Sequence, residues 1–202
     1  ADTVSRKQLI RDMLHCPQLL MIYLIIGVIV TGHYTGYSYV EPFLGQIAGF
    51  SESGITWTLT LFGVAGLLAS MIAGEGYTRH SRAIITTSCL GIPLMLLLLR
   101  PAADFSPVLL AALCVPWGMS LTVLNIAMQN DIVRLFPNDS AVPMSLYSGI
   151  FNLGIGAGAL VGGIATNHYL LGQIGYIGGA IALCAAIYCL LAYIPARRQT
   201  LS

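Results

Sequence analysis

Six long apolar runs, separated by short polar breaks, divide the 202-residue sequence. A helix that crosses a bilayer needs about 20 mainly apolar residues, and the runs have about that length. The strands of a membrane barrel would instead alternate apolar and polar residues over about 10 positions, whereas runs such as LLMIYLIIGVIV are uninterrupted. The pattern therefore predicts an all-α membrane protein, a bundle of six transmembrane helices. The predicted spans are about 19–42, 55–74, 83–99, 107–129, 144–165 and 174–194.

The composition agrees with this class. Hydrophobic residues make up 56% of the chain and charged residues only 8%, whereas soluble domains carry about 25% charged residues. The net charge of +1 gives no indication of nucleic-acid binding. The five cysteines have no metal-ligand spacing, so neither a zinc site nor a disulfide framework is predicted. Because the sequence also has no hydrolase, metalloprotease or phosphate-loop motif in a suitable context, we predict neither an enzyme nor a bound cofactor.

The basic residues predict an orientation. If both termini lie on one side of the membrane, eight of the nine basic residues fall on that side and only Arg100 on the other. Cytoplasmic loops carry the excess of Lys and Arg, so both termini are predicted to be cytoplasmic. We predict a cytoplasmic linker end at 1–16, the bundle at 17–195 and a cytoplasmic tail at 196–202. The eight residues are Arg6, Lys7, Arg11, Arg79, Arg82, Arg134, Arg197 and Arg198.

Small residues recur at four-residue spacing in the fifth span and, less densely, in the second. Glycines at this spacing form a flat strip on which another helix can approach closely. Ordinary helix packing explains each strip alone, but the density of the fifth suggests a closely fitted, sliding contact; such strips do not by themselves separate a transporter from another compact bundle. These residues are Gly154, Gly158 and Gly162 in the fifth span and Gly66, Ser70 and Gly74 in the second.

Polar side chains inside the spans are few, and such groups usually face the interior of a bundle. The first span ends in HYTGYSYVEPF, where His33 and Tyr37 lie one helical turn apart with Tyr34 beside them. The fourth span carries polar and aromatic counterparts, which are Trp117, Asn125 and Gln129. We predict that the two groups form opposite walls of a water-accessible cavity; a satisfied core histidine is the alternative for His33. Tyrosine, tryptophan and amide groups suit a neutral polyhydroxylated or aromatic solute, and no carboxylate ring or carbonyl filter suits an inorganic ion.

Two passages resemble a known family. HYTGYSYVEPFLGQIAGFS and LYSGIFNLGIGAGALVGG are similar to the seventh and eleventh helices of the major facilitator superfamily, more narrowly of the bacterial sugar efflux transporters in its drug:proton antiporter group. GEGYTRHSR resembles a degraded loop motif between the eighth and ninth helices. The resemblance implies a fold of two six-helix halves, of which this chain holds helices seven to twelve. It places the seventh and tenth helices around the cavity, the eighth and eleventh against the other half, and the ninth and twelfth outermost.

The resemblance also implies a function. The chain would be the C-terminal half of an efflux transporter of the bacterial inner membrane, exchanging a small neutral solute such as a sugar for protons. Its partners would be an N-terminal six-helix half, contacted by the glycines of the second and fifth spans, the solute, protons and the lipid bilayer. His33 is a hypothesis for proton coupling, because imidazole titrates near neutrality. Two alternatives stay open: a drug or nucleoside exporter of the same fold, and a non-transporting six-helix membrane subunit or scaffold.

Overall fold

The computed structural model confirms the fold class: in the part of the chain that it describes, six helices are long and apolar enough to cross a membrane. The structure describes residues 6–200, apart from the side chains of residues 72, 75, 76, 78, 199 and 200, and this part contains no strand. The predicted linker end and tail include residues 1–5 and 201–202, which lie outside the described residues. The candidate spans are Pro17–Tyr37, Glu52–Met71, Arg79–Phe105, Pro107–Leu135, Ala141–Asn167 and Leu171–Arg198.

The spans are assembled from helices of unequal length. The long helix α4 contains the second and third spans, and the sixth span is built from four consecutive short elements. In chain order the elements are α1 (Arg6–Leu14), α2 (Pro17–Tyr37), α3 (Val40–Pro42), the π-helical turn η1 (Phe43–Ile47), α4 (Glu52–Phe105), α5 (Pro107–Leu135), α6 (Ala141–Asn167), the 3-10 turn η2 (Leu171–Gln173), α7 (Ile174–Tyr188), the π-helical turn η3 (Cys189–Tyr193) and α8 (Ile194–Thr200).

Serine caps fix where two of the long helices begin. The Ser51 hydroxyl oxygen accepts a hydrogen bond from the Gly54 N–H at 3.2 Å, at the start of α4. The Ser106 hydroxyl oxygen accepts one from the Leu109 N–H at 3.4 Å, at the start of α5. Each bond satisfies a donor that the first turn of a helix leaves free. Pro107 follows directly, at a position where its missing N–H costs no helical bond.

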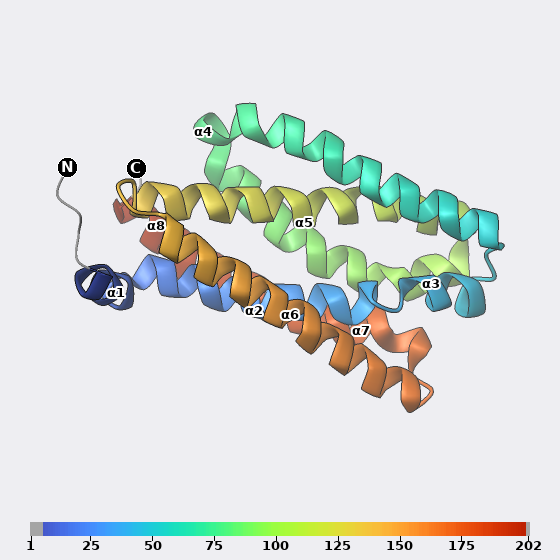
Figure 1. The fold of residues 1–202 in the computed structure, drawn as a ribbon. Coiled ribbons are helices and arrows are strands. Elements are labelled where there is room, and N and C mark those ends of the chain that lie inside the picture. The colour runs from blue at the N-terminus through green and yellow to red at the C-terminus, as the bar shows by residue number, and fades with distance from the viewer. Residues whose placement is uncertain (1–5, 201–202) are drawn as a thin grey trace.

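Helix α4 folds back on itself at His80. The backbone leaves the helical region there, with φ −129° and ψ 27°. The sequence predicted a break between the second and third spans at this place. The turn lies at the end of the bundle that also holds α1 and α8, so the described N- and C-terminal segments lie at the same end (Figure 1).

The first span is shorter than predicted. The sequence predicted one continuous helix to Pro42, but α2 ends at Tyr37 because Tyr39 leaves the helical region, with φ −120° and ψ 19°. The chain resumes as α3 and η1. As a result, His33 lies in the penultimate turn of α2, while Glu41 lies beyond the helix and is exposed.

The glycine strip of α6 packs inside the chain. Helix α2 is the central element, packed between α6 and α7, while α4 packs on α5 and α7. Gly154, Gly158 and Gly162 all face α2; a Cβ at Gly158 would lie 2.6 Å from the Thr31 carbonyl oxygen and 2.7 Å from the Tyr34 Cβ. The close approach follows from the spacing. The prediction that these three glycines contact another six-helix half is wrong, because α2 of the same chain covers that face.

The weaker strip in α4 divides between two environments. Gly66 is buried against α5, where a Cβ would lie 2.9 Å from the Thr122 hydroxyl oxygen. Gly66 therefore also packs inside this chain, and its predicted contact with another half is wrong. Ser70 is half-buried, and its hydroxyl donates to the Leu67 carbonyl oxygen at 2.7 Å. Gly74 is exposed, with no atom within 4 Å of a Cβ placed on it. Ser70 and Gly74 therefore remain accessible from outside the chain.

Candidate functional site

An aromatic cluster joins α2, α4 and α5. The Trp117 indole N–H of α5 donates to the Nδ1 atom of His33 on α2, at 2.9 Å. Three further rings surround the imidazole: the ring centroids of Tyr34, Tyr37 and Phe62 lie 4.8, 5.5 and 6.3 Å from that of His33. We call these five residues the aromatic cluster. It brings together residues of the two spans that the sequence selected, and adds Phe62 from α4.

One buried polar atom of the aromatic cluster has no hydrogen-bond partner among the described residues. Among the described side chains, two buried polar atoms lack a hydrogen bond: the Nε2 atom of His33 and the hydroxyl oxygen of Thr166. Buried polar atoms in native proteins are nearly always hydrogen-bonded, and exceptions often mark functional positions or internal water. The Nε2 atom of His33 is therefore the most informative atom of the cluster.

A second polar group lies between α5 and α6. The Gln129 side-chain amide donates to the Asn125 Oδ1 atom at 3.1 Å, and the Tyr147 hydroxyl donates to the same oxygen at 2.6 Å. The Asn125 NH₂ group and the Gln129 carbonyl oxygen have no hydrogen-bond partner among the residues that the structure describes. We call these three residues the amide cluster. Asn125 follows Trp117 by two turns, or about 12 Å along α5.

The six residues predicted to line a cavity thus form two groups and differ in exposure. His33 and Trp117 are 0% exposed, so neither side chain forms part of the surface of this chain. The other four predicted residues are half-buried: Tyr34, Tyr37, Asn125 and Gln129.

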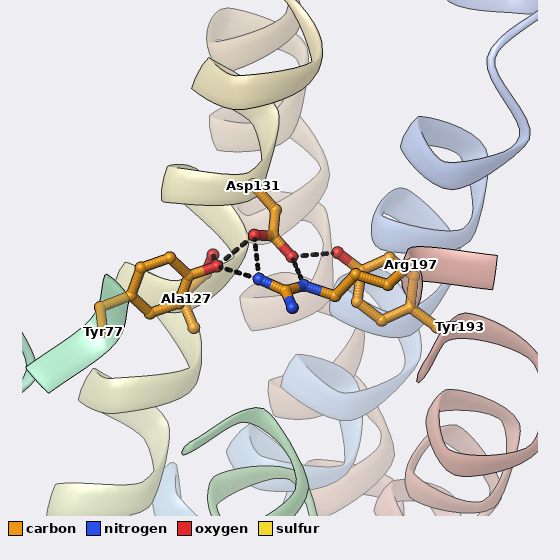
Figure 2. A network of polar contacts seen from close by, with 5 residues as sticks. All are labelled: Tyr77, Ala127, Asp131, Tyr193 and Arg197. Atoms are coloured by element: carbon orange, nitrogen blue, oxygen red, sulfur yellow. Dashed lines mark hydrogen bonds and ion pairs between the residues drawn. The ribbon is translucent and has the colours of Figure 1, made fainter. Parts of the chain in front are cut away.

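A charged network joins Asp131 of α5 to Arg197 of α8 and to Tyr77, which lies three residues before the turn of α4 at His80 (Figure 2). Asp131 of α5 is 0% exposed. Its carboxylate accepts hydrogen bonds from Arg197 of α8 at 2.7 Å (Nε to Oδ2) and 3.0 Å (Nη2 to Oδ1). The Tyr193 hydroxyl donates to Oδ2 at 2.5 Å, and the Tyr77 hydroxyl donates to Oδ1. The Tyr77 hydroxyl also lies 3.1 Å from the Ala127 carbonyl oxygen and accepts from Arg197 at 3.2 Å.

The network satisfies its own charges. Burial and the neighbouring Asp131 carboxylate raise the pKa of Tyr77, which lies between the second and third spans, so its hydroxyl stays protonated and donates. The Arg134 guanidinium lies 5.0 Å from the centroid of the Tyr77 ring, a cation–π contact. A buried ion pair holds a fold together when further hydrogen bonds satisfy both partners. We therefore assign the network to structure, because both carboxylate oxygens are occupied by protein donors.

Sequence reasoning missed the charged network and two members of the clusters. Asp131 lies two residues beyond the predicted end of the fourth span, and Arg197 lies in the predicted tail. The available signal was an acidic residue at the end of one span and a basic residue at the same end of another. Phe62 and Tyr147 stand in apolar runs with nothing to mark them. Among the side chains that the structure describes, which do not include Glu75, no three His, Cys, Asp or Glu residues are grouped closely enough to hold a metal ion.

Six apolar spans, with uncharged polar clusters held between some of them, define a membrane protein that crosses the bilayer several times. Residues 19–202 match the family model of the Major Facilitator Superfamily. The chain belongs to the major facilitator superfamily, whose members are transporters. The resemblance seen in the sequence is confirmed at this level.

Proposed function

We propose that this chain is one six-helix half of a secondary efflux transporter that moves a small neutral solute, such as a sugar, in exchange for protons. One observation carries the proposal: the unpartnered polar groups of both clusters are uncharged. Among the described residues these groups include the Nε2 atom of His33, the Asn125 NH₂ group and the Gln129 carbonyl oxygen. Asp131, the fully buried carboxylate among the described side chains, is already neutralised by its ion pair with Arg197. Aromatic faces with a few uncharged polar groups suit neutral ligands.

Export, proton exchange and the bacterial inner membrane rest on the resemblance of the first and fifth spans to sugar efflux transporters. The cytoplasmic location of both termini rests on the distribution of the basic residues. It is supported by the position of α1 and α8 at one end of the bundle (Figure 1). The carboxylates that couple such transporters to protons would belong to the other half, since Asp131 is occupied.

We propose that the other half packs on the outward faces of α4 and α6. Exposed small and polar residues recur along α6 at positions not covered by α2: Ser145, Gly149, Asn152 and Gly156. No atom lies within 4 Å of a Cβ placed on Gly149 or Gly156. The exposed side-chain amide of Asn152 would be costly against lipid, and small residues allow backbones to approach closely. Both observations support a protein partner on this face.

A counterflow assay tests the solute class. Liposomes holding the chain and a complementary six-helix half are loaded with one unlabelled solute and diluted into labelled solute, so that exchange needs no coupling ion. We expect exchange of a neutral sugar and none of a charged sugar phosphate. If only lipophilic cations or only nucleosides were exchanged, the chain would belong to an exporter of those solutes and not of sugars. No exchange of any solute, in liposomes that contain the inserted pair, would contradict the transport proposal.

A further inference from the structure

The hydrogen bond from Trp117 fixes the protonation pattern of His33. An indole nitrogen only donates hydrogen bonds, so the Nδ1 atom that receives the Trp117 N–H at 2.9 Å carries no proton. In a neutral imidazole the proton then sits on Nε2. The His33 ring is thus a hydrogen-bond donor at Nε2, and this donor is buried without a partner.

The surroundings of His33 are uncharged. Tyr34 and Tyr37 face the ring from α2 itself, Phe62 from α4, and Trp117 from α5. The Tyr37 ring stacks on the imidazole with an interplanar angle of 19°, and Tyr34 meets it edge-on at 78°. The titratable neighbours are the two tyrosine hydroxyls and the Cys114 thiol, which lies near Tyr37. The ion pairs of the described residues lie elsewhere, between Arg100 and Asp104 and between Arg197 and Asp131.

We propose that Trp117 is a positioning residue that holds His33 as the Nε2–H tautomer. The buried Nε2–H group then binds an acceptor oxygen of the transported solute, a step that rests on the proposed function. An N–H donor pairs with a hydroxyl, ether or carbonyl oxygen and repels a cation. An anion would enter an uncharged aromatic site without a counter-charge, which is unfavourable. The ligand is therefore a neutral solute that presents an oxygen, with a ring or a C–H face to pack on the surrounding aromatic side chains.

The same geometry argues against a role for His33 in carrying protons. To take up a proton, His33 would have to lose the hydrogen bond from Trp117, because Nδ1 already uses its lone pair as the acceptor. The ring would then be a buried cation among uncharged groups, which is unfavourable. The hypothesis that His33 couples transport to protons is therefore replaced by a role in binding.

The roles of the aromatic residues follow from their exposure. Trp117 is fully buried and commits its only polar atom to His33, so it acts on the solute through the imidazole. Tyr37 is half-buried and stacks on both His33 and Phe62. The acceptor oxygen at Nε2 can come from the solute or from an internal water, and the experiment below separates the two sources.

Nitrogen NMR of the chain in lipid nanodiscs, labelled with ¹⁵N-histidine, reads the tautomer directly. The chain has four histidines, and the His33 signals are identified by their loss in His33→Gln. We expect a single Nε2–H tautomer from pH 6 to 8. In Trp117→Phe, which keeps an aromatic ring but removes the donor, we expect mixed tautomers. Trp57→Phe is the matched control, because Trp57 is 74% exposed and lies outside the cluster. Mixed tautomers in the unaltered chain, or no change in Trp117→Phe, would overturn the positioning role.

Solute addition tests the second part of the inference. With the complementary half present, a transported neutral solute is expected to shift the His33 Nε2–H signal. The apparent affinity is expected to fall about 2- to 10-fold in Trp117→Phe, the loss of one hydrogen bond. If solutes are transported but leave the signal unchanged, the acceptor is an internal water and the binding role is overturned. If no solute is transported, the proposed function fails, while the tautomer measurement still decides the role of Trp117.

Discussion

Arg197 and Asp131, 66 residues apart in the sequence, form a two-point ion pair with bonds of 2.7 and 3.0 Å. Asp131 is fully buried and Arg197 nearly so. The pair joins the end of the sixth span to the end of the fourth, and the Tyr77 hydroxyl adds the turn of α4. Three helix ends on one side of the bundle are thus held at a single carboxylate (Figure 2).

Replacing one member of this pair should destabilise the bundle strongly. Asp131→Asn leaves the Arg197 guanidinium buried without a counter-charge, and breaking a buried pair in this way costs about 3–5 kcal/mol. The measurement is the thermal unfolding midpoint of the purified chain in detergent. The double variant Asp131→Leu with Arg197→Met removes both charges and should be more stable than Asp131→Asn.

Asp104→Asn is the matched control for the charged network. Asp104 pairs with Arg100 at 3.1 Å, but its side chain is 63% exposed and that of Arg100 is 35% exposed. Exposed pairs of this kind contribute about 0–1 kcal/mol. Equal midpoints for Asp104→Asn and Asp131→Asn would show that the network does not hold the helix ends together.

The contact between α2 and α6 predicts unequal effects of the same substitution at neighbouring glycines. In Gly158→Ala the new methyl group would lie within 2.7 Å of atoms of α2. Such overpacking costs about 1–3 kcal/mol. In Gly156→Ala no atom lies within 4 Å of the methyl group, so the variant should unfold at the same temperature or slightly higher. Equal loss of stability in both variants would contradict the packing of α6 on α2.

A larger side chain at the same exposed glycine tests the proposed contact with another half. Gly156→Leu should leave insertion and the unfolding midpoint of this chain unchanged, because the position faces outward. It should prevent close approach of a second backbone and reduce co-purification with the complementary half by at least about tenfold. Leu191→Ala, at a position that is 75% exposed on η3 and so lies outside the proposed contact face, serves as the control for surface substitutions. Unchanged co-purification of Gly156→Leu would place the other half elsewhere.

His33→Gln should weaken transport without changing its pH dependence. The glutamine side chain can replace one hydrogen bond but not the imidazole ring stacked on Tyr37. Loss of one hydrogen bond corresponds to about a 2- to 10-fold drop in apparent affinity. The ratio of variant to unaltered transport rates, measured between pH 6 and 8, should stay constant. A ratio that changes across this range would assign a proton-carrying role to His33 after all.

The sequence predicted the six spans and the residues with unusual chemistry, because both depend on local composition. It selected His33 and Trp117 from their rarity in apolar runs. It could not pair them, because 84 residues separate them and the pairing depends on how α2 and α5 cross. Gly158 shows the same limit: its spacing predicted a close contact, but only the fold shows that the contact is made with α2. Asp131 was missed because a span predicted from apolar runs ends at the first charged residue. The sequence does not show that a basic residue of another helix makes burial of that charge favourable.

Transport by the two halves together tests the central claim most directly. The chain is reconstituted into liposomes alone and with the complementary half, and movement of a labelled neutral sugar is followed after a pH gradient is imposed. We predict movement only when both halves are present and only while the gradient lasts. Movement by this chain alone would contradict the account, because a single six-helix bundle would then transport by itself.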